Sequence, residues 1–345
     1  MTRNPLHCIL PPELLDRLAR AADDEVRSTA LDTLALDHRF RLARAESASR
    51  TGGFESRPVT FARIGGRAER TVYNQQESTD QTPGSVARSE GQEASGDDAV
   101  NAAYDGLGAT YDYYWTTFGR DSIDGQGMAL LGLVHFGRSY ANAFWDNAGH
   151  MFFGDGDGRI LTQTARGLDV VGHELTHGVT QHEANLTYSG QAGALNESVS
   201  DVFGIQVKQF ALGQDVTQSD WLIGADIVGE ALRPALRSMA QPGTANPHDT
   251  QPADMDHYIP GGDVHVNSGI PNRAFHVVAT TLGGNAWDAA GRIWYDTVCD
   301  GALRSSAGFV QFGRLTLKHA QRNYGADSRE VQAVRDGWEA VKVPL

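Results

Sequence analysis

The stretch Asp169-Val170-Val171-Gly172-His173-Glu174-Leu175-Thr176-His177 decides how this chain of 345 residues is interpreted. Its apolar residues recur at helical spacing, which predicts a helix over residues 169–182. Residues four apart share one face of a helix, so His173 and His177 are expected to lie together. Imidazole nitrogens bind zinc readily, and a carboxylate beside them can act as a base. The spacing therefore predicts a zinc site with Glu174 next to it.

The alternative is a pair of surface histidines on an amphipathic helix. The same helix carries several apolar side chains, which indicates that it is buried: Val170, Val171, Leu175 and Val179. Buried imidazoles on either side of a carboxylate need partners. This favours the metal site over the surface pair.

A third ligand must come from another segment, and the stretch 196–201 is a candidate. Glu197 and Asp201 are again four apart on a predicted helix. One carboxylate can reach the metal while the other accepts a hydrogen bond from a ligand imidazole. An acidic cluster favoured by the helix dipole is the other interpretation of this pair.

Composition excludes several classes of protein. The net charge is −14, from 29 Lys and Arg against 43 Asp and Glu. Nucleic-acid binding needs a basic surface, so no such partner is expected. We expect no membrane span, since no apolar run approaches about 18 residues. Cys8 and Cys299 are too few for a disulfide framework. The first residues lack a secretory apolar core, which predicts cytoplasmic synthesis and leaves later signal-less release open.

The chain is expected to be an α+β protein with two lobes, strand-rich early and helix-rich late. Alternation predicts strands between Val59 and Tyr73, and a helix is expected over residues 97–118. Later helices are predicted over residues 169–182, 194–212, 268–283, 286–299, 307–322 and 328–341. Residues 1–48 form a separate unit with two helical patterns, and the polar stretch 45–53 reads as a flexible linker. That unit is either a small helical hairpin or a removable prosegment.

Several motifs in the same order resemble the thermolysin family of zinc metallopeptidases, and within it the protealysin-like subgroup. The resemblance covers most of the chain. It is carried by Asn142-Ala143-Phe144-Trp145, Gly154-Asp155-Gly156-Asp157-Gly158, residues 169–177, Tyr188, Gly193-Ala194-Leu195-Asn196-Glu197, Ser200-Asp201-Val202-Phe203-Gly204, Leu236-Arg237-Ser238-Met239 and Val264-His265-Val266-Asn267-Ser268-Gly269.

The resemblance implies an endopeptidase fold of two lobes with the active-site cleft between them. Its expected divisions are a prosegment at 1–48, a β-rich lobe at 49–187 and an α-helical lobe at 188–345. Zinc would bind His173, His177 and Glu197, with Asp201 behind His173. Glu174 would be the general base that takes a proton from the attacking water. Tyr188 and His265 would hydrogen-bond the oxyanion that develops during the reaction.

The resemblance also implies how peptide or protein substrates bind. Asn142 and the backbone of Ala143 would hold an extended peptide in the manner of strand addition. Arg237 would bind a substrate carbonyl beside the scissile bond. Val170 and Leu236 match positions that line the pocket for the residue after that bond, which predicts a bulky hydrophobic residue there. Ordinary core packing is the alternative role for these two side chains.

Two departures from the family pattern affect expectations. At the family's double calcium site Asp169, Asp220 and Asp226 match, whereas Lys208, Leu222 and Ala225 replace glutamates. The lysine ammonium can stand in for part of the ion's charge, so calcium is expected to be absent there. The aspartate expected five residues before His265 is replaced by Pro260. Asp263 comes two before the histidine, and which acid orients His265 is left open.

The N-terminal unit resembles the short prosegment of protealysin-like precursors through Ile9-Leu10-Pro11-Pro12-Glu13-Leu14-Leu15. The implied role is an intramolecular inhibitor that is removed by cleavage near residues 45–53. Cys8 lies beside this motif, and either caps the zinc as a thiolate or packs as a small apolar side chain. Cys299 is expected to lie in the core.

Two other classes of protein share parts of this pattern. Metallo-aminopeptidases share the two-histidine helix, but their acidic Gly-x-Met-Glu-Asn segment is not found in this sequence. A catalytically inactive binding module would be favoured by loss of Glu174, Tyr188 or His265. All three residues are present, which favours the active peptidase.

Overall fold

The computed structural model describes residues 7–50 and 66–345, with side chains 44–50 left out. The chain divides into two compact units. The first comprises Met1–Gly178 and Asp226–Leu232, and the second comprises Val179–Ala225 and Arg233–Leu345. The predicted division after residues 48 and 187 stays a prediction.

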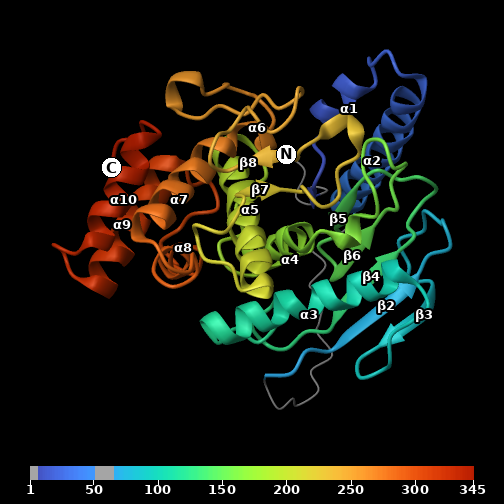
Figure 1. The fold of residues 1–345 in the computed structure, drawn as a ribbon, viewed down its shortest axis with the longest axis horizontal. Helices are drawn as coiled ribbons and strands as arrows, with labels where there is room; N and C mark the ends of the chain where they lie inside the picture. Colours follow the sequence, from blue (N-terminus) through green and yellow to red (C-terminus); the bar gives the residue numbers. More distant parts are fainter. Residues whose placement is uncertain (1–6, 51–65) are drawn as a thin grey trace. The chain divides into compact units, whose positions relative to one another are not determined.

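The first unit is built on a six-stranded mixed sheet with the order β1-β5-β6-β4-β2-β3 (Figure 1). β4 pairs in parallel with both β2 and β6, and the other neighbours are antiparallel. Its strands are β1 (His7–Cys8), β2 (Arg70–Asn74), β3 (Ser85–Ser89), β4 (Leu130–Val134), β5 (Ala143–Trp145) and β6 (His150–Phe153). The sheet confirms the predicted strand-rich region and includes the expected strand at residues 71–73.

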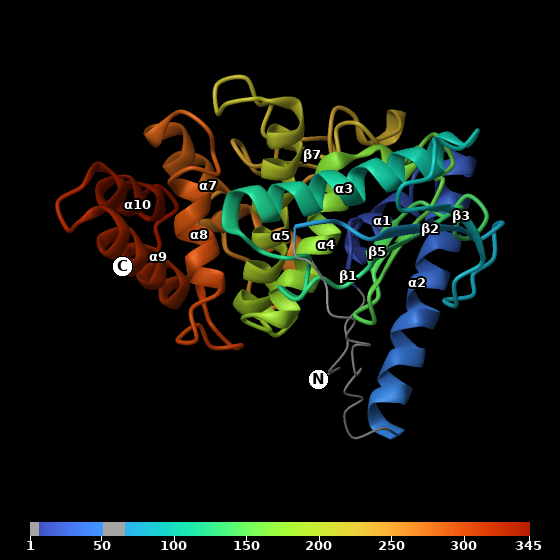
Figure 2. The same ribbon diagram turned by 90° about the horizontal axis from the view of Figure 1, so that it is seen from below.

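Helices cover the two faces of this sheet. Successive residues of a strand face opposite sides. A Cβ on Gly132 of β4 would meet Leu107 of α3, whereas its neighbour Leu133 packs in a cluster with Leu36 of α2. α3 and α2 therefore lie on opposite faces (Figure 2). The unit's helices are α1 (Pro12–Leu18), α2 (Asp24–Arg50), α3 (Asp98–Phe118), the 3-10 helices η1 (Thr164–Arg166) and η2 (Glu230–Leu232), and most of α4 (Leu168–His182).

β1 extends the sheet beyond β5, with His7 opposite Trp145 and Cys8 opposite Phe144. Cys8 enters an aromatic cluster with Leu36 of α2, completed by Leu133, Phe136, Tyr140, Phe144 and Phe152. Its thiol donates to the carbonyl of Leu10 at 3.4 Å and accepts from Arg41 at 3.3 Å. Cys8 is thus a packed core side chain, as one of the two interpretations held.

The second unit is mainly helical, and its core is aromatic. Trp294 of α8 stacks on Trp338 of α10 with ring centroids 6.2 Å apart, and Phe275 of α7 packs against Trp294. The elements are α5 (Gly190–Leu212), β7 (Leu222–Ile223), β8 (Arg237–Ser238), η3 (Met255–His257), α6 (Val264–Asn267), α7 (Gly269–Leu282), α8 (Ala290–Val298), α9 (Phe309–Tyr324) and α10 (Arg329–Ala340). The two units together confirm the α+β class.

Some expectations need correction. Residues 45–50 belong to α2 and are not a flexible linker, because no glycine or proline interrupts the helix before Gly52. Residues 51–53 and the strand predicted from Val59 to Ile64 lie outside the described residues. Cys299 ends α8 as its C-cap and is only partly buried, so it is not a full core residue. Among the described residues, no helix combines the length and apolarity that crossing a membrane requires.

Candidate metal centre and its surroundings

Two histidine nitrogens meet on α4. His173 and His177 are both buried, and their Nε2 atoms lie 3.1 Å apart. Two imidazoles that bind one tetrahedral zinc at about 2.0–2.1 Å have their nitrogens about 3.3 Å apart. The pair therefore fits a zinc ion, and its burial excludes the alternative of two surface histidines.

Glu174 is held between α4 and the sheet. Its side chain is fully buried, and its Oε2 accepts a hydrogen bond of 3.1 Å from the backbone N–H of Trp145 in β5. Gly178, one turn further along α4, leaves room for the Trp145 ring, because a Cβ there would come within 2.9 Å of it. The strand thus fixes the carboxylate beside the two histidines.

In the second unit, three of the predicted residues meet. The Tyr188 hydroxyl donates to Oε1 of Glu197 and lies 3.3 Å from Nε2 of His265. His265 Nε2 is also 3.3 Å from Oε2 of Glu197. Glu197 and His265 are almost fully buried. A carboxylate, a phenol and an imidazole therefore form one polar group on α5, α6 and the loop before α5.

Asp263 is the acid that orients His265. Its Oδ1 lies 2.6 Å from Nδ1 of His265 and also accepts the backbone N–H of that residue at 2.9 Å, as the N-cap of α6. Burial lowers the pKa of His265, but the carboxylates of Glu197 and Asp263 outweigh it and raise the pKa above its usual value. Asp263 therefore takes the orienting role that the family's aspartate would have at position 260.

Asp201 and Arg237 form a buried ion pair. Arg237 donates from Nε and Nη2 to the two carboxylate oxygens at 2.9 and 2.8 Å, and the Asn272 amide adds a bond of 2.8 Å. Both charged groups are nearly inaccessible to solvent. Burial lowers the pKa of Arg237, but the Asp201 carboxylate reverses this and raises it. Asp201 therefore anchors Arg237. The sequence predicted a substrate contact for Arg237 but not this ion pair.

Asn142 and Ala143, predicted to hold substrate, are in contact with the N-terminal segment. Asn142 accepts the N–H of Leu10 at 3.0 Å and donates to its carbonyl at 3.3 Å, while Ile9 N–H donates to the carbonyl of Ala143 at 3.1 Å. Asp37 of α2 in turn accepts from Asn142 at 3.1 Å. The edge of β5 is thus paired with residues 7–10.

The remaining predicted positions differ in burial, and the Asp220 side chain is 45% exposed. Val170 and Leu236 are almost fully inaccessible to solvent, which suits core packing as well as a pocket wall. Lys208 places its ammonium 3.6 Å from the carboxylate of Asp220, with only 8% of its side chain exposed. The cation predicted to stand in for calcium therefore does pair with one of the remaining acids.

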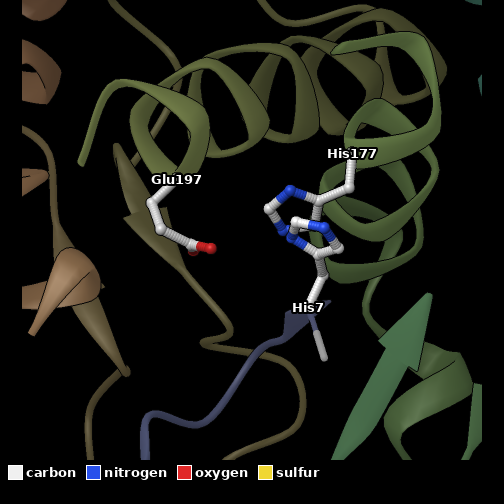
Figure 3. Close-up of side chains that lie close together, drawn as sticks. All are labelled: His7, His177 and Glu197. Atoms are coloured by element: carbon white, nitrogen blue, oxygen red, sulfur yellow. The ribbon is translucent and has the colours of Figure 1, made fainter. Parts of the chain in front are cut away.

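The sequence did not indicate that His7 lies close to the predicted zinc ligands. Its ring packs against that of His177, with centroids 4.3 Å apart and planes tilted by 30° (Figure 3). Glu197, on α5, is the third side chain drawn there. The available signal was strand alternation: if Cys8 faces the core, its neighbour must face the other side. A strand of two residues is too short to show that pattern in a sequence.

Comparison with known proteins places the chain in a family. Residues 58–181 match the thermolysin metallopeptidase catalytic domain, and residues 184–343 match the thermolysin metallopeptidase alpha-helical domain. The chain therefore belongs to the thermolysin family of metallopeptidases, and it is a peptide hydrolase. This confirms the resemblance drawn from its motifs.

The most informative relatives are precursors and proteases of similar length. The chain superposes on the precursor of protealysin, a metalloproteinase from Serratia proteamaculans, with a TM-score of 0.85 and 45% identity, covering 98% of this chain and 100% of that one. An extracellular metalloprotease of Pectobacterium carotovorum subsp. carotovorum is 43% identical over 356 residues, covering 100% and 99% of the two chains. Protease PrtS of Photorhabdus sp. (strain Az29) is 42% identical over 291 residues, covering 80% and 76%. The protealysin-like assignment is thus confirmed over the full length.

Proposed function

We propose that this zinc metalloendopeptidase binds one zinc ion through His173, His177 and Glu197 and uses Glu174 as its general base. The observation that carries the proposal is the 3.1 Å approach of the two imidazole nitrogens beside a buried carboxylate. A bound zinc lowers the pKa of a water molecule and polarises the scissile carbonyl. Glu174 then accepts the water proton and passes it to the leaving amine.

Tyr188 and His265 are proposed to stabilise the charge that develops during the reaction. Tyr188 offers a hydroxyl, and His265 offers an imidazole N–H. Such donors contribute most when charge builds on the substrate oxygen. The raised pKa of His265 favours its protonated, donating form, and its hydrogen bond with Asp263 fixes the ring orientation. Asp201 is proposed to support His173, and Arg237, held by Asp201, to bind a substrate carbonyl.

We further propose that residues 1–48 act as an inhibitory prosegment. Residues 9 and 10 take the same backbone and amide groups of Ala143 and Asn142 that would hold an extended substrate. Strand addition is a common way to bind peptides, and one edge accepts one strand at a time. The docked prosegment and a substrate therefore compete for β5.

Two finer proposals concern specificity and metal content. Val170 and Leu236 are proposed to favour a bulky hydrophobic residue after the scissile bond. Calcium is proposed to be absent from the family's double site, because Lys208 pairs with Asp220 there. Calcium found beside Asp169 by metal analysis would contradict the second proposal.

The central test is hydrolysis of casein and of a furylacryloyl dipeptide by the activated protein, with and without a zinc chelator. Activity should disappear with the chelator and return with zinc. The Glu174→Ala variant should retain zinc but lose activity by at least 100-fold, the scale of a lost acid–base catalyst. An activated wild type that binds zinc and cleaves neither substrate would refute the proposal.

A further inference from the structure

β1 presents two side chains to opposite faces of the sheet. Cys8 lies opposite Phe144 and shares its aromatic cluster, on the α2 side. His7 lies opposite Trp145, whose ring packs at Gly178 of α4. Because paired residues of an antiparallel sheet face the same side, His7 is directed to the helix that carries His173 and His177. The Cys8 thiol therefore points away from His173 and His177. The His7 imidazole points toward them.

The register that produces this placement is fixed by polar contacts. Leu10 is held by both polar atoms of the Asn142 side chain, at 3.0 and 3.3 Å. Ile9 N–H donates to the carbonyl of Ala143 at 3.1 Å. A shift of one residue would break these bonds and move Cys8 out of the core to the α4 side. The position of His7 is therefore a built feature of the docked segment.

At this position the imidazole is buried against a predicted zinc ligand. His7 is 5% exposed, and its ring centroid is 4.3 Å from that of His177. His7 and His177 each present a ring nitrogen within 4.8 Å of the other, and His173 Nε2 lies 3.1 Å from His177 Nε2 (Figure 3). Imidazole is the commonest metal ligand in proteins. Three imidazoles thus gather on one side of α4 in the precursor.

We propose that His7 is an additional zinc ligand in the precursor, bound alongside the ligands proposed above. This inference rests on the proposed zinc site. Catalytic zinc sites keep one position open for water, whereas four protein ligands make a closed, structural type of site. A prosegment imidazole at the metal would fill that position. Latency would then have two parts, an occupied β5 edge and a closed metal, and release of residues 7–10 would open both.

The test uses the full-length chain with Glu174→Gln, which prevents self-cleavage, loaded with one zinc ion. X-ray absorption at the zinc edge counts the imidazole ligands. We expect three in this precursor and two in the His7→Phe variant, whose ring keeps the packing and removes the nitrogens. Competition with a chelator should show that the variant binds zinc more weakly than the parent. Loss of a group that only hydrogen-bonds a metal ligand weakens binding by ~10- to 100-fold, and loss of a ligand should weaken it at least as much. His38→Ala, which removes an exposed histidine of α2, is the matched control and should change neither result.

Hydrogen exchange of the Leu10 amide checks that β1 stays paired with β5 in the His7→Phe variant. If β1 is released there, His7→Gln serves as the second variant. Two imidazoles in the intact Glu174→Gln precursor would overturn the role of His7 without any further variant. Unchanged zinc affinity in a docked His7 variant would do the same. Failure of the zinc site itself is distinguishable, because the His173→Ala and His177→Ala chains would then bind zinc as the parent does.

Discussion

Asp263 illustrates how a single residue can take over a function from another position in the chain. Its carboxylate caps α6 and contacts Nδ1 of His265 at 2.6 Å. Asparagine also caps helices well, so Asp263→Asn preserves the cap and removes only the charge beside the imidazole. We expect kcat of the activated enzyme to fall by about 10-fold with KM little changed, because the His265 imidazole loses the carboxylate that orients it.

Steady-state kinetics with a furylacryloyl dipeptide measure this effect. Pro260→Asp in the Asp263→Asn background supplies an acid at the family's usual position and should restore part of kcat. Asp256→Asn, at an exposed aspartate of η3, is the control. A change confined to KM would show that Asp263 does not position a group for the chemical step.

Arg237 and Asp201 provide a stability prediction at the same scale. Arg237→Met leaves the buried Asp201 carboxylate with the Asn272 amide but without its cation. Breaking one partner of a buried ion pair costs about 3–5 kcal/mol. Urea unfolding of the Glu174→Gln chain should show this loss. Arg329→Met, at an arginine whose side chain is 71% exposed, should change stability by less than about 1 kcal/mol. Equal effects of the two substitutions would contradict the role of the pair.

The sequence identified these residues more readily than it identified their partners. Motif spacing placed His173, Glu174 and His177 on one helix, because four-residue spacing has a fixed meaning there. The bond between Asp201 and Arg237 joins residues 36 apart, and no local pattern specifies such a contact. Asp263 lies close to His265 in sequence, but only the cap geometry of α6 shows that its oxygen reaches the ring.

At the scale of elements, one buried acid contributes to the docking of α2. Asp37 accepts from the Tyr140 hydroxyl at 2.6 Å and from Asn142 at 3.1 Å. Burial raises its pKa to about 6, against the smaller opposing effects of these two bonds and of Arg41. A raised pKa favours docking with the acid protonated. Its contribution is therefore complete below the usual value of 3.8 and is lost as the pH rises through about 6.

Hydrogen exchange of residues 7–15 in the Glu174→Gln chain measures this dependence, after correction for intrinsic rates. Protection of the Leu10 amide should fall between about pH 4 and pH 6 and then level off. In Asp37→Asn it should vary little over that range, because asparagine does not titrate. Asp32→Asn changes an exposed acid of α2 and should behave as the parent. Parallel pH profiles for the Asp37 variant and the parent would exclude Asp37 as the titrating group.

Helix α3 was predictable from the sequence and β1 was not. The predicted helix at 97–118 matches α3 closely because Asp97 caps its start and Gly119, with φ of 70°, ends it. β1 has two residues, and its existence depends on pairing with β5, about 135 residues later. Pairing between segments so distant is a tertiary effect that local propensity does not determine. The pairing of residues 7 and 8 with β5 is consequently the part that required a structure.

At the scale of the whole molecule, stability should not depend on calcium. Lys208 holds its ammonium 3.6 Å from Asp220 with 8% of the side chain exposed. A calcium ion bound beside Asp220 would have to displace the Lys208 ammonium or lie close to it. Repulsion between the two cations would weaken calcium binding, and the burial of Lys208 strengthens that repulsion. A ligand at 100 times its dissociation constant stabilises a protein by about 2.7 kcal/mol, so bound calcium would be visible in unfolding. We expect calcium to leave the unfolding temperature of the zinc-loaded Glu174→Gln chain unchanged.

Lys208→Glu provides the comparison, since it replaces the cation with an acid and should give a larger calcium-dependent shift than the parent. Removal of zinc, in contrast, should lower the unfolding temperature of both chains, because the ligands proposed for it are buried and would bind the ion only when folded. Scanning calorimetry with metal analysis of the same samples separates the two ions. A calcium-dependent shift in the parent, accompanied by bound calcium, would contradict the proposed role of Lys208. Dependence on zinc alone would mean that a single ion serves both stability and catalysis.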